Sequence, residues 1–229
     1  MPLEPSQVRL DGSPLHRLVA SHFPPIALFE TVADPADLEI AFAIEAMTND
    51  RLKDDVGDLS LIPDQDRIVG PGATPVMAAF THIGMPSRFT AGGYGVYYGS
   101  PDVATAVAET VYHREQFLGA THEPDTELTM RQYINEVALP LHDVRQYDEL
   151  HDPSSYVVSQ AFAKAIRGNG SNGLVYRSVR HEGGECVAAF RPTSLTPVIQ
   201  GQHFRYVWSG HHQKITQVLS VEAFPNIQS

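Results

Sequence analysis

The stretch from Ser87 to Leu118 limits how this chain can fold, because it joins a turn, an aromatic strand and a helix start without interruption. The turn Ala91-Gly92-Gly93 leads into residues 94–98, Tyr-Gly-Val-Tyr-Tyr, whose aromatic and β-branched side chains predict a strand. Next, Ser100-Pro101-Asp102 predicts a helix N-terminus, with Ser100 as the cap and Pro101 at the first helical position. The sequence therefore predicts a strand-turn-helix unit in this stretch.

Three side chains of this unit suit a nucleotide. The guanidinium of Arg88 can hold a pyrophosphate oxygen bidentately, and the ring of Tyr98 can lie against a flat base. Glu109 follows a run of small and apolar residues, which places it at the edge of a cleft, where a carboxylate can bind ribose hydroxyls. If the bond to nicotinamide breaks in NAD, the ribose gains positive charge that this carboxylate would stabilise. The set therefore indicates an NAD site.

These residues belong to a longer pattern that runs from about Ala41 to Pro192. Its motifs are Thr48-Asn49-Asp50-Arg51, Arg88-Phe89, Gly95-Val96-Tyr97-Tyr98, Ala106-Val107-Ala108-Glu109, the run from Gly173 to Arg180, and Gly184-Glu185-Cys186. The pattern resembles the RES domain family, which is named for its arginine, glutamate and serine. The resemblance places the family's arginine on Arg88, its tyrosine on Tyr98, its glutamate on Glu109 and its serine on Ser178.

The resemblance also implies a fold, an activity and a partner. The fold would be α+β, an ADP-ribosyltransferase-like split, mostly antiparallel β-core flanked by helices. The activity would be that of a toxin of a toxin–antitoxin system, which cleaves NAD and transfers ADP-ribose to a protein, to phosphate or to water. The chain, in its longer, upstream-extended form, most resembles the RES toxin that ADP-ribosylates phosphoribosyl pyrophosphate synthetase. NAD would be a substrate rather than a resident cofactor, with no metal, and the partners would be a cognate antitoxin and a protein acceptor of ADP-ribose.

Composition narrows the function classes further. The chain has 229 residues, of which 42% are hydrophobic and 19% charged, as in ordinary globular proteins. Its formal net charge of −11 argues against nonspecific nucleic-acid binding by this chain alone, and requires that an NAD site concentrate its arginines locally. A single cysteine, the absence of an apolar run of membrane-spanning length and an N-terminus unlike a secretory signal favour a cytoplasmic protein without a membrane span.

The chain is expected to divide into an N-terminal arm with the start of a first helix, residues 1–40, and a RES-type catalytic domain, residues 41–229. The helix begins near Asp34, and residues 59–74 form a loop rich in Pro and Gly. Further expected elements are strands at 133–139, 186–190 and 204–208 and an amphipathic helix at 155–167, with a turn at Asn172-Gly173 before another strand.

Each candidate site residue also has an ordinary structural interpretation. Arg88 can be a salt-bridge arginine, Glu109 a solvated helix carboxylate and Tyr98 a core aromatic. Ser178 and Arg180 are expected to lie on one face of a strand, with Arg177 on the opposite face. The face with Ser178 and Arg180 would be an anion site. The residues expected to bind NAD are Arg51, Arg88, Tyr98, Ser178 and Arg180.

Other chemistries fit less well. His113 lies one turn after Glu109 and can be a proton donor, a partner of the glutamate or an ordinary helix histidine. Cys186 is expected to be a buried structural residue, and neither HExxH nor CxxC occurs. Two function classes therefore stay open, an NAD-consuming enzyme and a catalytically silent module that binds nucleotide in the same pocket.

Overall fold

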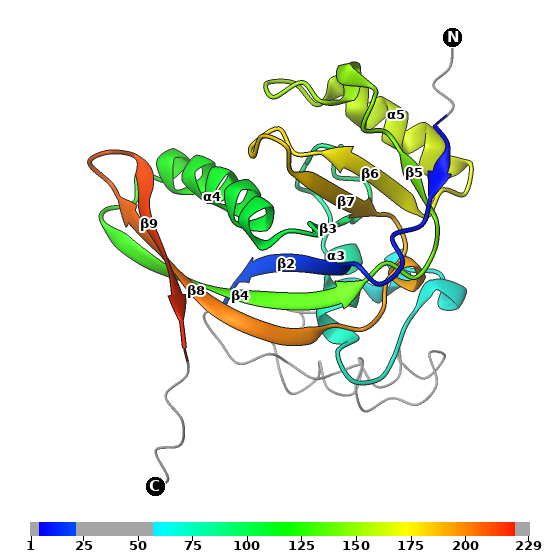
Figure 1. Ribbon diagram of the computed structural model, residues 1–229, viewed down its shortest axis with the longest axis horizontal. Helices are drawn as coiled ribbons and strands as arrows, with labels where there is room; N and C mark the ends of the chain where they lie inside the picture. The colour runs from blue at the N-terminus through cyan, green and yellow to red at the C-terminus, as the bar shows by residue number, and fades with distance from the viewer. Residues whose placement is uncertain (1–4, 22–56, 223–229) are drawn as a thin grey trace, which may run out of the picture.

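Two β-sheets form the centre of the fold (Figure 1). The computed structural model describes residues 5–21 and 57–222. The five-stranded sheet has the order β1 (Gln7–Val8), β5 (Leu141–Asp143), β6 (Gly173–Arg177), β7 (Glu185–Ala189) and β3 (Tyr97–Gly99). The four-stranded sheet has the order β2 (Pro14–Ala20), β4 (Thr126–Glu136), β8 (Ile199–Ser209) and β9 (Lys214–Val221).

Strand pairing is antiparallel everywhere in these sheets except between β5 and β6. The chain makes this parallel connection through helix α5 (Val157–Gly168), because a parallel pair needs a crossover rather than a tight turn. The two sheets meet where His16 of β2 and Ser100, next to β3, exchange backbone hydrogen bonds of 2.7 and 2.9 Å. This pair of bonds forms a seam between the sheets.

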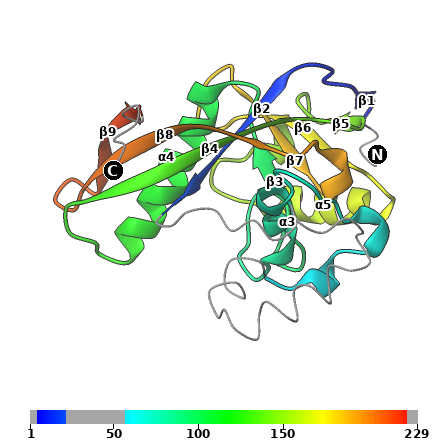
Figure 2. The same cartoon turned by 90° about the horizontal axis from the view of Figure 1, so that it is seen from below.

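Helices cover the sheets from several sides (Figures 1 and 2). Helix α4 (Val103–Ala120) packs on the four-stranded sheet through Ala106 and Leu118, which join a core cluster with Met130 and Trp208. Helix α5 packs through Ala163 against Leu174 and its neighbours in the five-stranded sheet. Helix α3 (Thr74–Thr81) adds Val76, Met77 and Phe80 to the largest core cluster.

The expected strand-turn-helix unit is present, with different boundaries. The strand is shorter than expected, because β3 covers only Tyr97–Gly99 and residues 91–94 form bends. The helix cap is Asp102 and not Ser100, since the Asp102 carboxylate accepts from Thr105 N at 2.8 Å. Pro101 accordingly precedes the helix. The Ser100 hydroxyl instead donates to the backbone carbonyl of Glu185 in β7 at 2.7 Å.

Residues 5–21 of the expected N-terminal arm take part in the β-structure as β1 and β2. β2 pairs along its whole length with β4, and its residues Leu15 and Leu18 are buried. The expected loop at 59–74 contains two short 3₁₀ helices, Leu59–Leu61 and Asp64–Asp66. The helix expected near Asp34 lies outside the described residues.

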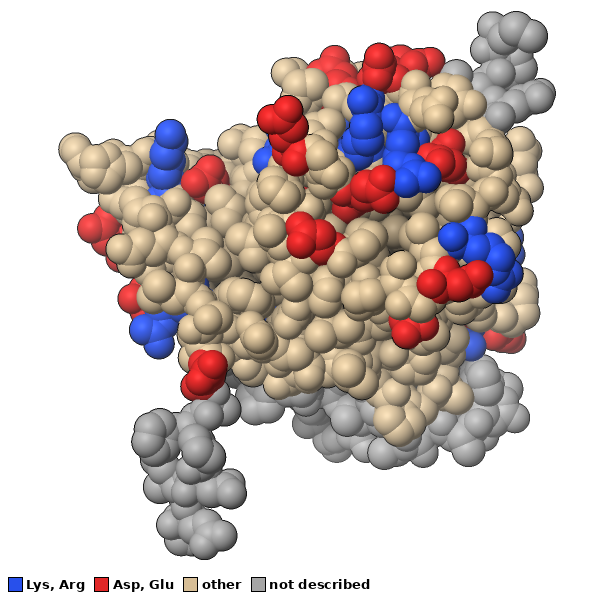
Figure 3. Space-filling model, in the orientation of Figure 1, with Lys and Arg blue, Asp and Glu red and all other residues tan. Residues whose placement is uncertain are grey.

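The fold class agrees with the sequence-based expectation. It is α+β, with a split, mostly antiparallel β-core flanked by helices. On the face shown in Figure 3, basic and acidic side chains are interspersed and no extended basic surface forms. None of the helices in residues 5–21 and 57–222 has the length and apolar character needed to cross a membrane.

Close packing of the 93–95 segment on α3 gives a stability prediction. A Cβ at Gly95 would lie 2.3 Å from the Ala79 carbonyl oxygen and 2.4 Å from the Phe80 Cα, so the backbone would have to shift. We expect Gly95→Ala to lower the free energy of unfolding by about 2–4 kcal/mol. Gly93 has no atom within 4 Å of such a Cβ, so Gly93→Ala is the matched control. Urea unfolding measures both variants, and equal unfolding midpoints would contradict the packing described.

Candidate active site

A cavity of about 490 Å³ lies between β2, β3, helix α4 and the segment before Arg88. Its lining includes three of the four residues expected at the site, Arg88, Tyr98 and Glu109. The fourth, Ser178, contacts the cavity through Glu109. The fold thus brings together side chains that are separated by up to ninety positions, since Arg88 and Ser178 are the outermost of the four in sequence. Whether these residues carry out catalysis stays a prediction.

Glu109 is held by a directed hydrogen bond. The Ser178 hydroxyl donates to Glu109 Oε1 at 2.6 Å and accepts from the backbone N–H groups of Arg180 at 3.1 Å and His181 at 2.9 Å. Because the two N–H groups occupy the acceptor side of the hydroxyl, its proton is directed to the carboxylate. Ser178 therefore fixes the position of Glu109 on the cavity wall.

Arg88 is buried, with 7% of its surface exposed, and its guanidinium is already oriented. Its Nη1 donates to the carbonyl oxygens of Leu150 at 3.1 Å and Asp152 at 3.0 Å. The Tyr156 ring centroid lies 4.7 Å from the guanidinium carbon. No acceptor for Nε or Nη2 is found in the described part of the chain, so these donors are free to bind a ligand.

Tyr98 forms the part of the wall next to Arg88. Its hydroxyl accepts from Phe89 N at 3.0 Å and shares a 2.7 Å hydrogen bond with the Ser87 hydroxyl. Burial raises the pKa of Tyr98 well above its usual value, so the phenol stays neutral at physiological pH. Tyr98 is therefore suited to ring contact and hydrogen bonding rather than to acid–base chemistry.

Arg17 of β2 also lines the cavity, and the sequence analysis did not single it out. Its Nη1 donates to the Tyr98 carbonyl at 3.1 Å, and its guanidinium carbon lies 4.6 Å from the Tyr97 ring centroid. Its Nε is buried and has no hydrogen-bond partner. Burial lowers the pKa of Arg17 from a value so high that the group stays protonated. The available signal was an arginine directly before the apolar residues Leu18, Val19 and Ala20.

The cavity concentrates positive charge in an acidic protein. Arg17, Arg88 and Arg114 all line it, and none of the three is in an ion pair with a described carboxylate. Glu109 is the one carboxylate among the lining residues that the structure describes. This local excess of arginine contrasts with the formal net charge of −11 for the whole chain. The arrangement favours an anionic ligand that also presents a cationic or hydroxyl group to Glu109.

The pKa values of His113 and Cys186, which also line the cavity, are shifted by burial. Burial lowers the pKa of His113, more than the Glu109 charge raises it, so the imidazole is neutral at pH 7. Burial and the nearby Glu109 raise the pKa of Cys186, whose Sγ lies 3.9 Å from Glu109 Oε1. Cys186 is 2% exposed, which confirms that it is a buried residue. A thiol with a raised pKa is a poor nucleophile.

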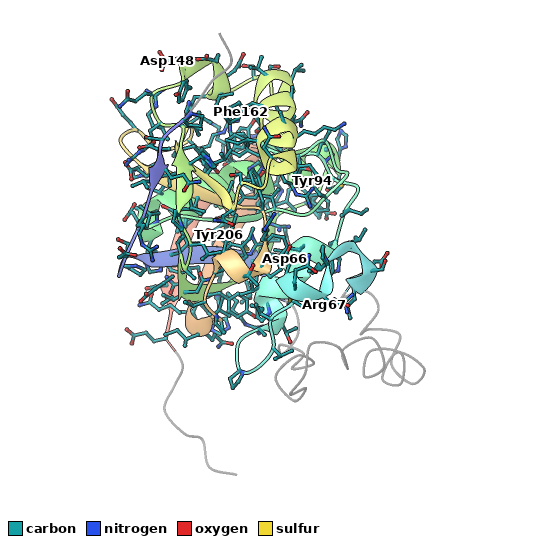
Figure 4. The ribbon with its side chains drawn as sticks, turned by 90° about the vertical axis from the view of Figure 1, so that its right-hand side faces the viewer. Asp66, Arg67, Tyr94, Asp148, Phe162 and Tyr206 are labelled. Carbon is teal, nitrogen blue, oxygen red and sulfur yellow. The ribbon has the colours of Figure 1, made fainter. Side chains whose placement is uncertain are left out.

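Arg180 lies outside the cavity wall. Its guanidinium carbon sits 3.4 Å from the Tyr112 ring centroid, and Nη2 donates to the Pro153 carbonyl at 2.8 Å. The expectation that Ser178 and Arg180 share a strand face is wrong, because β6 ends at Arg177 and both residues lie in the following turn. Arg177 is exposed and pairs at 2.5 Å with Asp148, which Figure 4 shows at one end of the molecule.

The remaining expected features are not part of this cavity. Arg51 lies outside the described residues. None of residues 59–74 lines the cavity. Within residues 5–21 and 57–222, no group of three His, Cys, Asp or Glu side chains could hold a metal ion.

Comparisons with known proteins identify relatives of the chain. The model of the RES domain family matches residues 65–209, a range that contains Arg88, Tyr98, Glu109 and Ser178 but not Arg17. The "Uncharacterized protein y4oC" of Sinorhizobium fredii (strain NBRC 101917 / NGR234) is 29% identical over 201 residues, which cover 85% of this chain and 83% of that protein. The crystal structure of the M. tuberculosis MbcT-MbcA toxin-antitoxin complex is similar with a TM-score of 0.46 and 8% identity, covering 90% of this chain and 89% of that chain.

Proposed function

The chain belongs to the RES domain family, and from this membership and the cavity geometry we propose that it is an NAD-consuming toxin of a toxin–antitoxin system. It cleaves NAD at the nicotinamide–ribose bond and transfers ADP-ribose to a protein acceptor. One observation carries the proposal. A carboxylate held by a serine, Glu109, shares one cavity with three arginines that have no ion-pair partner among the described residues.

Binding of NAD follows from the charge of the cavity. The pyrophosphate carries two negative charges, and the guanidinium groups of Arg17, Arg88 and Arg114 supply donors that do not have to leave a carboxylate partner. Tyr98 contributes a flat ring to the same wall. The ribose that carries nicotinamide would then lie at Glu109, the negative end of the cavity.

The chemical step needs charge stabilisation at one atom. When the bond between C1′ and the nicotinamide nitrogen breaks, its electron pair stays with the nitrogen and nicotinamide leaves as a neutral molecule. The ribose is left with an oxocarbenium-like charge, which the Glu109 carboxylate stabilises more strongly than it stabilises the bound substrate. The acceptor then attacks C1′ and loses its proton. Ser178 contributes by holding Glu109 in place at 2.6 Å.

The acceptor and the antitoxin belong to the same proposal. Protein transfer is proposed from the family resemblance, and phosphate and water are the alternative acceptors. Because an enzyme that consumes NAD harms its own cell, we propose that a cognate antitoxin blocks the cavity, with a carboxylate or other anionic group on Arg88. A purified complex with the product of the neighbouring gene that cleaves NAD at the rate of the free chain would contradict this blockage.

The decisive experiment measures nicotinamide release from NAD by the purified chain. Parallel reactions contain inorganic phosphate, a cell lysate with adenylate-labelled NAD, or neither. We expect nicotinamide release together with labelled protein in the lysate reaction, and little release where phosphate or water is the only acceptor. Formation of ADP-ribose 1″-phosphate or of free ADP-ribose without labelled protein would assign phosphate or water as the acceptor. NAD binding without nicotinamide release would identify a silent nucleotide-binding module and contradict the proposal.

The serine gives a smaller, specific prediction. Ser178→Ala removes the hydrogen bond that positions Glu109 but keeps the carboxylate, so we expect kcat to fall about tenfold, the effect of roughly 1.4 kcal/mol, with little change in KM. Ser209→Ala, an exchange on the β8–β9 hairpin away from the cavity, is the control. Steady-state nicotinamide release measures both variants. Full activity of Ser178→Ala would show that Glu109 needs no positioning by the hydroxyl.

A further inference from the structure

The position of the Arg88 guanidinium depends on the backbone on either side of His151. Arg88 Nη1 donates to the carbonyl oxygens of Leu150 at 3.1 Å and Asp152 at 3.0 Å, and these two residues are the chain neighbours of His151. They lie at the end of the short 3₁₀ helix Asp148–Leu150, which the bond from His151 N to the Asp148 carbonyl closes at 2.9 Å. One 3₁₀ turn has few backbone hydrogen bonds, so holding both carbonyl oxygens in place requires side-chain contacts.

The His151 side chain ties this turn to strand β6. The residue is buried, with 8% of its surface exposed. Its Nε2 accepts from the Arg177 backbone N–H at 3.0 Å, so the ring proton is on Nδ1, which donates to the Tyr147 carbonyl at 2.9 Å. Strand β5 ends at Asp143 and does not reach this end of β6. The imidazole therefore supplies an acceptor that the neighbouring strand does not.

The surroundings of the ring favour the neutral form of His151. The charged or titratable side chains that face it are Arg88, Asp148, Tyr176 and Arg177. Burial lowers the pKa of His151 more than the Tyr147 carbonyl raises it, and the two arginines lower it further against the opposite effect of Asp148. When the pH falls through this lowered pKa, Nε2 gains a proton and loses its bond with the Arg177 N–H, because both groups are then donors.

From this geometry we propose that His151 is a positioning residue for Arg88, and through Arg88 for the pyrophosphate of the substrate. With Nδ1 bonded to the turn and Nε2 bonded to β6, the imidazole holds both carbonyl oxygens where they accept from Arg88 Nη1. Nε and Nη2 of Arg88 are then left for the ligand. His151 does not line the cavity, so it acts through Arg88 alone. NAD as the ligand comes from the proposed function, whereas the contacts of His151 do not depend on it.

Two exchanges at His151 test the positioning. His151→Ala removes both ring hydrogen bonds, and we expect the KM for NAD to rise about tenfold with little change in kcat. His151→Gln places an amide oxygen where Nε2 lies, so it can accept from the Arg177 N–H and should keep KM within about threefold of the wild type. His142→Gln, at a half-buried histidine of β5 outside the cavity, is the control and should leave KM unchanged.

Steady-state nicotinamide release measures these constants, and circular dichroism confirms that each variant is folded. A folded His151→Ala variant with the wild-type KM would overturn the proposal. So would a His151→Gln variant that is as impaired as His151→Ala, because the acceptor for the Arg177 N–H would then have no effect on Arg88.

The pH dependence of KM provides a measurement that a purely structural histidine would not change. In the wild type we expect KM to rise as the pH is lowered below about 6.5, the ordinary pKa of histidine. In His151→Gln, which has no titrating group at this position, that rise should be lost. Glu109 and His113 titrate in both proteins, so only the difference between the two profiles reports on His151. Identical profiles of KM against pH would overturn the proposal, and this comparison does not require His151→Ala to fold.

Calorimetric titration with ADP-ribose separates the role of His151 from NAD cleavage. ADP-ribose carries the pyrophosphate but has no bond to nicotinamide. At neutral pH we expect His151→Ala to bind it about tenfold more weakly than the wild type, and His151→Gln to bind it nearly as the wild type does. This pattern in a chain that releases no nicotinamide would contradict the proposed function and support the role of His151. Equal binding by the wild type and His151→Ala, or no binding by the wild type, would overturn that role even if NAD is cleaved.

Discussion

Replacing Glu109 by glutamine is expected to slow nicotinamide release from NAD by a hundredfold or more, roughly the cost of removing one preorganised electrostatic contact. The amide has the size of the carboxylate and can still accept from the Ser178 hydroxyl, so the fold should persist. What is lost is the negative charge next to the ribose at the moment when positive charge develops there. The fall should therefore appear in kcat, with a smaller change in KM.

Glu115→Gln provides the matched control for this exchange. Glu115 lies on the same helix, α4, but outside the cavity, and a glutamine oxygen there can still accept from Ile215 N. It should retain wild-type turnover. Nicotinamide release at the wild-type rate by Glu109→Gln would remove Glu109 from the proposed mechanism. Expression without the antitoxin adds a cellular measurement, in which the Glu109→Gln variant should no longer inhibit growth.

Exchanging Arg88 for lysine should lower kcat/KM for NAD by about ten- to a hundredfold, mainly through a higher KM. Lysine keeps the charge but not the planar fork. In the structure one nitrogen of the Arg88 guanidinium, Nη1, already donates to the carbonyl oxygens of Leu150 and Asp152. A lysine ammonium group that satisfied these carbonyls would have little left to offer a pyrophosphate.

Three further arginine variants make the result specific. Arg177→Lys, at the exposed pair with Asp148, should behave as the wild type. Arg17→Lys should raise KM as Arg88→Lys does, since both guanidinium groups line the same cavity. Unchanged kcat/KM in Arg88→Lys together with lost activity in Arg180→Ala would move the pyrophosphate contact from Arg88 to Arg180.

Local sequence patterns predicted that a strand and a helix carry the site, but they did not predict where these elements begin and end. The aromatic run at residues 94–98 indicated a strand, but only its end is one, because Gly95 packs directly on α3 and the preceding residues bend. Ser100 satisfies every local rule for a helix cap. It is used instead in the seam with β2, a contact between residues far apart in sequence, and Asp102 caps the helix.

Long-range contacts explain what the sequence did not reveal at the site. Arg17 meets Tyr98 across 81 positions, so its role depends on the pairing of β2 with β4, which no local pattern near Arg17 encodes. The bond between Ser178 and Glu109 spans 69 positions and was not predicted, because the family resemblance placed both residues at the site without a contact between them. The strand interpretation of residues 178–180 is wrong because β6 ends at Arg177, and the Ser178 hydroxyl beyond it accepts from the backbone N–H groups of Arg180 and His181.

The seam between His16 and Ser100 places the cavity across two sheets. Arg17 belongs to one sheet, whereas Arg88 and Tyr98 lie with the other. A ligand that contacts both sides adds to the two backbone hydrogen bonds of the seam, the Arg17–Tyr98 hydrogen bond and the shared core, and it is released when the sheets separate. Thermal unfolding is thereby linked to ligand concentration. In a cell, the lifetime of the chain against proteolysis would then rise and fall with its own substrate.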